Sequence, residues 1–149
     1  MKTICFDDVM IDEEIVSESY RIEETEIIEC AEKWDPQPFH TDPDAAADSI
    51  FKGLTACSTH IFAVQSKLGH TLPKRFEVLA ALGIEELTFH NAVRPGDELV
   101  LKVRILEKIE SKSKQDRGII RNLCTLLNQN GEIVIQSIVR TMVARRPDL

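Results

Sequence analysis

Apolar and polar residues alternate with a period of two in the second half of the chain, a pattern typical of half-buried strands. The segments that we expect to form strands are residues 78–91, 99–105, 118–127 and 133–139. Asn130-Gly131 lies before the last of them and is a strong signal for a hairpin turn. A second turn is expected at residues 94–97. These features predict a mostly antiparallel sheet.

The first half of the chain has a different pattern, which predicts helices and loops. Residues 14–22 alternate only weakly and are expected to be extended. The acidic run Glu23–Glu26 then opens a helix, because negative charge favours the free amides of a first turn. The helix ends near Asp35, since Pro36 disfavours helical geometry in the residue before it. With Pro38 two positions later, the residues that follow Asp35 predict a stiff, irregular loop.

A short helical turn and a long helix are expected next. Asp42 is suited to cap a turn that begins at Pro43. The longer helix starts near Ser58 or Thr59, ends at Gly69 and is apolar over much of its circumference. An antiparallel sheet needs an apolar cover, and this helix is the element able to provide it. The fold class expected is therefore α+β.

The size and composition of the chain fit one domain that spans residues 1–149. Apolar residues make up 43% of the 149 residues, which is normal for a globular protein. No apolar run is long enough to span a membrane, and the first residues lack a signal-peptide pattern, so we expect a cytoplasmic protein. The four cysteines are scattered and are expected to be buried or half-buried thiols: Cys5, Cys30, Cys57 and Cys124.

The formal net charge of −7 argues against a nucleic-acid partner, because binding phosphates needs clustered Lys and Arg. One basic cluster interrupts this acidic chain, and it consists of Lys108, Lys112, Lys114, Arg117 and Arg121. Such a cluster is usually a solvated hairpin. A second hypothesis is that it binds an anionic cofactor arm, such as the phosphates of coenzyme A.

Asp35 and His40 are the residues with the clearest chemical potential. They lie five positions apart on the proline-stiffened loop, and a carboxylate beside an imidazole can act as a general acid/base pair. The spacing alone also fits a structural role, in which Asp35 caps the following turn and His40 is an ordinary loop histidine.

The run Asp35-Pro36-Gln37-Pro38-Phe39-His40 resembles the hydratase motif of the MaoC-like dehydratases, in which Asp-x-Asn-Pro-x-His precedes a Phe-Gly-rich turn. Val93-Arg94-Pro95-Gly96-Asp97 is similar to a second motif of that family, which leads into a strand. Together the similarities cover residues 20–146. They imply a hot-dog fold, in which an antiparallel sheet wraps a long central helix, and a homodimer or a higher homo-oligomer.

The resemblance also implies an activity in fatty acid metabolism, namely reversible addition of water to a trans-2-enoyl thioester that gives the (R)-3-hydroxyacyl product. Asp35 and His40 match the catalytic pair of that family. The substrate would be an acyl-CoA or an acyl-carrier thioester. No metal or further cofactor is implied, because the thioester itself acidifies the α-carbon.

Further site residues follow from the same resemblance. The backbone amide of Ser58 matches the position that binds the thioester carbonyl, which a glycine usually occupies in the family. The residues expected to contact substrate are Gln37, Phe51, Gly53 and Cys57. Three departures from the family pattern are Ser58 in place of glycine, Gln37 in place of asparagine and Lys52 in place of a small residue.

Other residues are expected to have structural roles. His60 is interpreted as a surface or capping residue, His70 and His90 as solvent-facing, and Trp34 as a packing residue. Two alternative functions remain open. A hot-dog thioesterase is ranked lower, because its carboxylate lies on the central helix and that helix offers only Gln65 here. A non-catalytic acyl-CoA-binding module is the other.

Overall fold

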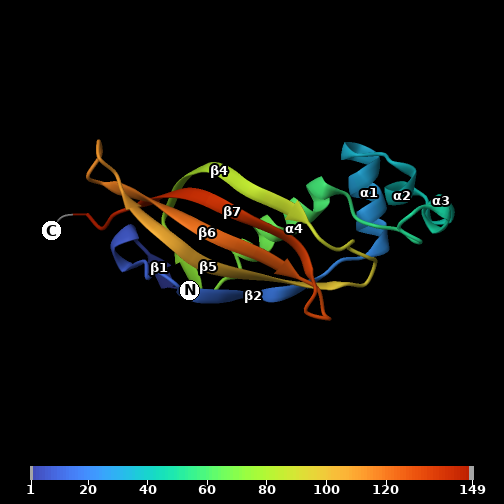
Figure 1. Ribbon diagram of the computed structural model, residues 1–149, viewed down its shortest axis with the longest axis horizontal. Coiled ribbons are helices and arrows are strands. Elements are labelled where there is room, and N and C mark those ends of the chain that lie inside the picture. The colour runs from blue at the N-terminus through green and yellow to red at the C-terminus, as the bar shows by residue number, and fades with distance from the viewer. Residues whose placement is uncertain (1, 148–149) are drawn as a thin grey trace.

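The computed structural model describes residues 2–147, in which a curved five-stranded sheet lies against a central helix (Figure 1). The strand order is β2-β5-β6-β7-β4, and every neighbouring pair is antiparallel. The bounds are β2 Glu14–Arg21, β4 Val78–Phe89, β5 Glu98–Glu110, β6 Arg117–Leu127 and β7 Ile133–Ala144. A small parallel pair, β1 (Lys2–Ile4) and β3 (Lys74–Phe76), lies apart from this sheet. The four predicted strands are therefore confirmed, most of them longer than expected.

Five helical segments accompany the sheet. They are η1 (Phe6–Asp8), α1 (Glu24–Trp34), α2 (Pro38–Thr41), α3 (Pro43–Asp48) and α4 (Ser58–Gly69). The predicted cap is confirmed, since the Asp42 side chain accepts hydrogen bonds from the amides of Asp44 and Ala45. The wholly irregular loop predicted after Asp35 is wrong in part. Pro38 begins α2, because its fixed φ suits the first helical position, where its missing N–H is not needed.

Helix α4 packs across the inner face of the sheet, and its neighbours identify which side of the helix faces which strand. Lys67 lies over the ring of Tyr20 on β2, 5.3 Å from its centroid. On the opposite side, Phe62 contacts Phe89 on β4 with ring centroids 6.5 Å apart. The arc between these two sides faces the middle of the sheet. It carries the buried residues Ile61, Gln65 and Leu68.

Strand β4 differs from the other long strands in its burial. Strands β5 and β6 largely alternate buried and less buried positions, as their sequence pattern predicts, whereas β7 has two adjacent buried pairs, Val134–Ile135 and Ser137–Ile138. In β4 no residue is buried, although its sequence is largely apolar. The exposed apolar residues of β4 are Val78, Leu79, Leu82, Ile84, Leu87 and Phe89. One edge of β4 pairs with β7, and the other edge has no strand partner within residues 2–147.

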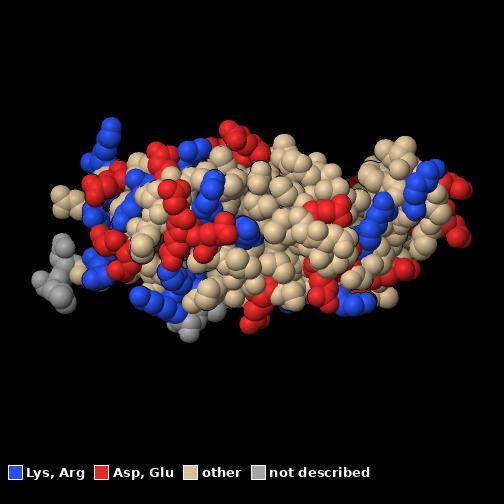
Figure 2. Space-filling model, turned by 60° about the horizontal axis from the view of Figure 1, so that its bottom comes forward, with Lys and Arg blue, Asp and Glu red and all other residues tan. Residues whose placement is uncertain are grey.

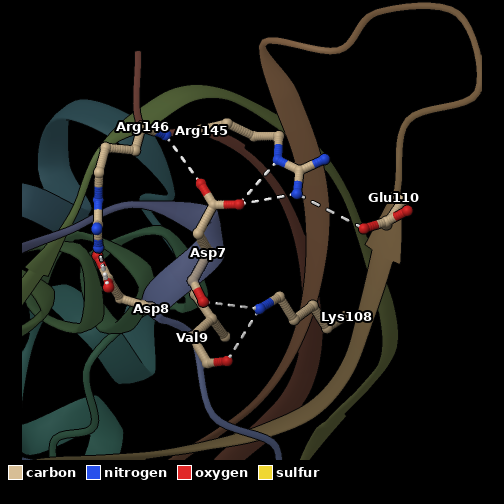
Figure 3. A network of polar contacts seen from close by, with 7 residues as sticks. All are labelled: Asp7, Asp8, Val9, Lys108, Glu110, Arg145 and Arg146. Carbon is tan, nitrogen blue, oxygen red and sulfur yellow. Dashed lines mark hydrogen bonds and ion pairs between the residues drawn. The ribbon is translucent and has the colours of Figure 1, made fainter. Parts of the chain in front are cut away.

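The segments near the two termini are tied together at the end of the molecule away from α1 (Figures 1 and 3). One carboxylate oxygen of Asp7 accepts hydrogen bonds from Nε and Nη2 of Arg145 at 2.9 and 2.8 Å, and the other accepts from the amide of Arg146 at 2.9 Å. Lys108 donates to the carbonyl oxygens of Asp7 and Val9. This network holds the N-terminal segment on the sheet.

Phe6 fills the space beneath this network. Its side chain is fully buried, and the cations of Lys108 and Arg145 lie 4.9 and 5.5 Å from its ring. The ring also packs directly on Gly118, where an added Cβ would lie 2.3 Å from it. Any larger residue at position 118 would therefore displace the phenyl ring. Among residues 2–147, no helix is both long and apolar enough to cross a membrane.

Candidate active site

A cavity of about 310 Å³ lies where α1, α2 and the start of α4 meet the end of β4. The residues that line it are Asp35, Phe39, His40, Phe51, Thr55, Ala56, Ser58, Ile61, Phe89, His90, Asn91 and Ala92. Most of this surface is apolar or aromatic, and a few polar groups interrupt it. Such a lining suits a small organic ligand with one reactive polar end.

Asp35 and His40 reach the cavity from two helices joined by a short link. Asp35 terminates α1, and its amide donates to the carbonyl of Ala31. His40 lies in α2, and its amide donates to the carbonyl of Gln37. The Nε2 atom of His40 lies 3.6 Å from Oδ2 of Asp35. This distance is too long for a direct hydrogen bond, so both side chains remain able to form a hydrogen bond with a third group in the cavity.

The orientation of the His40 ring is fixed by a backbone contact. Nδ1 of His40 lies 2.6 Å from the carbonyl oxygen of Thr55. A carbonyl only accepts hydrogen bonds, so Nδ1 carries the proton in this contact. In the neutral form of the ring, Nε2 is then the unprotonated nitrogen, and it lies 3.6 Å from Oδ2 of Asp35. In that form His40 can accept a proton from a molecule bound in the cavity.

Arg94 holds the chain segment that carries Thr55. Its guanidinium donates to the carbonyl of Gly53 at 2.8 Å and to that of Phe51. Its own amide donates to Oδ2 of Asp97 at 2.8 Å. The turn that resembles a family motif therefore supports the wall of the cavity, and Asp97 has the structural role expected of a residue in such a turn.

Ser58 is the first residue of α4 and lines the cavity. The amides of the first helical turn have no partner within the helix, and the positive end of the helix dipole lies there. Cys57 occupies the cap position, but its side chain makes no capping hydrogen bond, so it does not occupy these amides. The start of α4 can therefore donate hydrogen bonds to a carbonyl oxygen.

The predicted substrate contacts separate into two groups. Phe51 lines the cavity, whereas Gln37, Gly53 and Cys57 are not among the residues that line it. Gln37 caps α2 through its backbone, and Gly53 contributes a carbonyl to Arg94. In the same turn Lys52 adopts a left-handed φ of 55°, a conformation that glycine or asparagine adopts more readily than lysine. Direct contact of Gln37, Gly53 and Cys57 with substrate stays a prediction.

Several residues of the cavity could not be assigned from the sequence. Thr55, Phe89 and Asn91 become part of the wall only because β4 ends beside α2. His90 is exposed as expected, but it lies at the rim of the cavity. Trp34 was expected to be a packing residue, and this is wrong, because it is 64% exposed at the end of α1.

The expectation that His60 is a surface or capping residue is also wrong. Its side chain is buried between α4 and α1, with Nε2 3.5 Å from Oε1 of Glu26. The other oxygen of Glu26 accepts a hydrogen bond of 2.7 Å from the hydroxyl of Tyr20. Burial lowers the pKa of His60, and the nearby Glu26 opposes this shift. The hydrogen bond to Glu26, with burial, raises the pKa of Tyr20 to about 12.

The four cysteines are free thiols, buried or half-buried as predicted. Burial raises the pKa of Cys124 to about 12, so its thiol stays protonated at neutral pH. Burial and the neighbouring Cys57 raise the pKa of Cys30. No group of three metal-ligating side chains occurs among residues 2–147.

The basic cluster lies at the far end of the sheet from the cavity, at the β5–β6 hairpin (Figure 1). Charges of both signs are mixed at this end of the surface (Figure 2). Arg121 pairs with Glu85 and Glu107, and Arg117 pairs with Asp116. Strand β5 alone separates the hairpin from the cavity end by about 40 Å. The hairpin tip is therefore far from the cavity, whereas Arg121 lies within β6, and contact of the cluster with coenzyme A phosphates stays a prediction.

Comparisons with known proteins agree with this architecture. Residues 9–126 match the family model described as MaoC like domain. The MaoC-like dehydratase of Rhodospirillum rubrum is 34% identical, with 97% of this chain and 99% of that chain covered and a TM-score of 0.89. The uncharacterized protein YdeM of Bacillus subtilis is 25% identical over 93% of this chain and 98% of its own length.

A further structural likeness concerns the fold. R-hydratase PhaJ1 of Pseudomonas aeruginosa superimposes with a TM-score of 0.77 at 24% identity, covering 96% of this chain and 87% of that chain. The hot-dog fold and the α+β class predicted from the sequence are confirmed.

Proposed function

Because the chain belongs to the MaoC-like dehydratase family, we propose that it adds water reversibly to a trans-2-enoyl thioester and forms the (R)-3-hydroxyacyl thioester. The observation that carries the proposal is the shared cavity of Asp35, His40 and Ser58. In this cavity Asp35 and His40, which can accept a proton, lie beside the start of α4, whose amides can bind a carbonyl oxygen. Acyl-CoA is the proposed substrate, with coenzyme A as part of that substrate and no separate cofactor.

The gap between the catalytic groups suits one water molecule. Oδ2 of Asp35 and Nε2 of His40 are 3.6 Å apart, and both accept hydrogen bonds when the His40 ring is neutral. A water at about 2.8 Å from each atom donates one hydrogen to each, which leaves an oxygen lone pair free for C3 of the substrate. As the oxygen adds to C3, one water proton passes to this pair. The pair then delivers a proton to C2 on the same face.

The thioester carbonyl gains negative charge while the C3–O bond forms. In the proposed complex its oxygen accepts a hydrogen bond from the Ser58 amide at the positive end of the α4 dipole. A backbone amide serves this purpose with any side chain, so the serine found here in place of glycine leaves the donor intact. The thioester itself acidifies C2, so the chemistry needs only proton transfer and carbonyl stabilisation.

Crotonyl-CoA provides the direct test, with the loss of enoyl-thioester absorbance as the readout. We expect hydration by the wild type and loss of activity in both Asp35→Asn and His40→Ala. Turnover that survives in both variants would remove this site assignment. Release of free coenzyme A would indicate a thioesterase instead. Binding without any turnover would indicate the non-catalytic module.

We also propose that the functional unit is a homodimer joined through β4. Strand β4 is largely apolar, both of its faces are exposed, and one of its edges has no strand partner within residues 2–147. Such a strand tends to associate with another chain, and a second copy of this protein can cover it. The cavity reaches this strand through Phe89. The variant Ile84→Glu should reduce the sedimentation mass from dimer to monomer and lower hydration activity. A wild type that sediments as a monomer at micromolar concentration would contradict the dimer.

A further inference from the structure

Three buried polar side chains of the core have unpartnered atoms. They are Gln65 on α4, Asn122 on β6 and Ser137 on β7, which we call the polar layer. Their exposed fractions are 8%, 7% and 1%. Among residues 2–147, no hydrogen-bond partner is present for Oε1 of Gln65, Oδ1 of Asn122 or Oγ of Ser137. Buried polar atoms are normally paired, because each unpaired one costs about 1–3 kcal/mol.

The helix places Gln65 directly beyond the cavity wall. Gln65 follows Ile61 by one turn, and Ile61 lines the cavity. Both residues lie on the arc of α4 that faces the middle of the sheet, between Lys67 on the β2 side and Phe62 on the β4 side. A chain that enters beside Ser58 and follows this face of α4 therefore passes Ile61 and then meets Gln65.

Ser137 and Asn122 lie on the inner face of the sheet, which α4 covers. Phe89 lines the cavity and pairs in register with Ile135 of β7. Ser137 follows Ile135 by two residues, so its side chain lies on the same inner face, one step deeper. Asn122 belongs to the inner face of the adjoining strand β6. The polar layer thus has members on both the helix and the sheet.

The chemistry of the polar layer selects a class of ligand. Two of its unpartnered atoms are amide oxygens, which accept hydrogen bonds, and the third is a hydroxyl. Cys124 pairs in register with Ser137, and its buried thiol stays neutral. None of these groups carries a charge, so a carboxylate buried among them would lack a cationic partner. A neutral group with an O–H or N–H donor satisfies the two amide oxygens.

We propose that the polar layer is the distal end of the acyl site and that the protein prefers short enoyl thioesters whose chain ends in a neutral hydrogen-bond donor, such as a hydroxyl. The inference rests on the proposed thioester-binding function. A plain hydrocarbon chain of the same length would leave the amide oxygens unpaired, whereas a terminal hydroxyl supplies the missing donor.

The length of the helix sets the expected chain length. Gln65 follows Ser58 by seven residues, which is about 10 Å along the axis at a rise of about 1.5 Å per residue. The glutamine side chain leans back toward the start of the helix and shortens this span. Hexanoyl-CoA and 6-hydroxyhexanoyl-CoA are therefore the matched pair of probes. Both are saturated, so their binding can be measured whether or not the protein hydrates enoyl thioesters.

The test compares dissociation constants from calorimetry. We expect the wild type to bind 6-hydroxyhexanoyl-CoA roughly ten-fold more tightly than hexanoyl-CoA. Gln65→Met keeps the approximate volume but removes the acceptor, and Ser137→Ala removes the hydroxyl, so each should abolish most of this preference. Ser66→Ala, at an exposed position on the same helix, should retain it.

The outcomes separate this proposal from the proposed function. Equal or tighter binding of hexanoyl-CoA by the wild type overturns the polar layer as a ligand site, and so does a preference that persists in both variants. If that preference is absent and Gln65→Met raises the unfolding temperature, the layer is only an imperfectly satisfied part of the core. A clear hydroxyl preference without hydration of crotonyl-CoA would leave this inference standing and reject the hydratase.

Discussion

Two carboxylate–imidazole pairs lie at the same end of this protein, and helix α1 supplies both carboxylates. Asp35 and His40 are separated by 3.6 Å, and Glu26 and His60 by 3.5 Å. The side chains are also similarly buried. The exposed fractions of the carboxylates are 35% for Asp35 and 32% for Glu26, and those of the imidazoles are 10% for His40 and 9% for His60. Distance and burial therefore do not distinguish the two pairs.

The surroundings of the two pairs do differ. Asp35 and His40 line a cavity, and the backbone carbonyl of Thr55 fixes which ring nitrogen is free. His60 is not among the residues of that cavity, and Tyr20 already donates to Glu26. The first pair is accessible to a molecule bound in the cavity, and the second joins β2, α1 and α4. The lesson is that access and orientation identify an acid/base pair better than proximity does.

Replacing the two carboxylates in parallel gives the largest expected contrast. Asp35→Asn should lower kcat/KM for crotonyl-CoA by about 10²–10⁴-fold, because a positioned acid or base contributes that much. Its unfolding temperature should change little. Glu26→Gln should keep most of the activity and lower the unfolding temperature. Equal losses of activity in the two variants would mean that the pairs are not functionally distinct.

A smaller effect on activity is expected when the support of His40 is loosened. Arg94→Gln removes the guanidinium that holds the carbonyls of Phe51 and Gly53, so the Thr55 carbonyl should no longer fix the His40 ring. We expect kcat to fall by about ten-fold with a smaller change in KM. Arg94→Lys should recover only part of kcat, since one ammonium cannot span both carbonyls. Unchanged kcat in Arg94→Gln would show that His40 needs no such support.

The second pair should be visible in the pH dependence of stability. Burial lowers the pKa of His60 in the folded protein below its ordinary value of 6.5. As the pH falls, the unfolded chain therefore binds this proton first. The stability contributed by neutral His60 is present above pH 6.5 and declines below it.

His60→Gln removes this contribution. The wild type should lose up to about 1.4 kcal/mol per pH unit more than the variant as the pH falls through this window. Denaturant unfolding between neutral pH and pH 5 measures the difference. Since Glu26 raises the pKa of His60, Glu26→Gln should make the loss steeper than in the wild type. Identical slopes in all three proteins would rule out His60 as the titrating group.

The smallest effect is expected at Tyr20, which donates a hydrogen bond to the carboxylate of the second pair. Tyr20→Phe removes the hydroxyl that donates to Glu26, which should cost about 1 kcal/mol of unfolding free energy. Hydration activity should stay within roughly two-fold of the wild type, since surface substitutions far from a functional site change a measured value by about that much. A large loss of activity would show that the Tyr20–Glu26–His60 group reaches the reaction after all.

The periodicity of the sequence was sufficient to predict the sheet, because alternation reports directly on which face of a strand is buried. The apolar circumference of the segment between Ser58 and Gly69 likewise identified the central helix. The proximity of Asp35 and His40 could be predicted because both residues and the intervening prolines lie in one short segment. Local signals of this kind do not require knowledge of the tertiary structure.

The features that were missed depend on contacts between distant segments. Glu26 and His60 meet only after α1 and α4 pack, so the sequence around His60 carries no sign of burial. The cavity wall formed by Phe89 and Asn91 requires β4 to end beside α2. The role of Phe6 depends on packing against Gly118. Hydrophobic periodicity cannot report such pairings, because it describes one segment at a time.

The hydrogen bonds of Asp7 with Arg145 and Arg146 have a consequence for the order of events in folding. They join residues 138 and 139 positions apart in the chain. Closing so long a loop before the sheet exists gains little and costs chain entropy. We therefore expect these contacts to be absent from the transition state. Weakening these hydrogen bonds should accelerate unfolding and leave the folding rate almost unchanged. They therefore set the lifetime of the folded state.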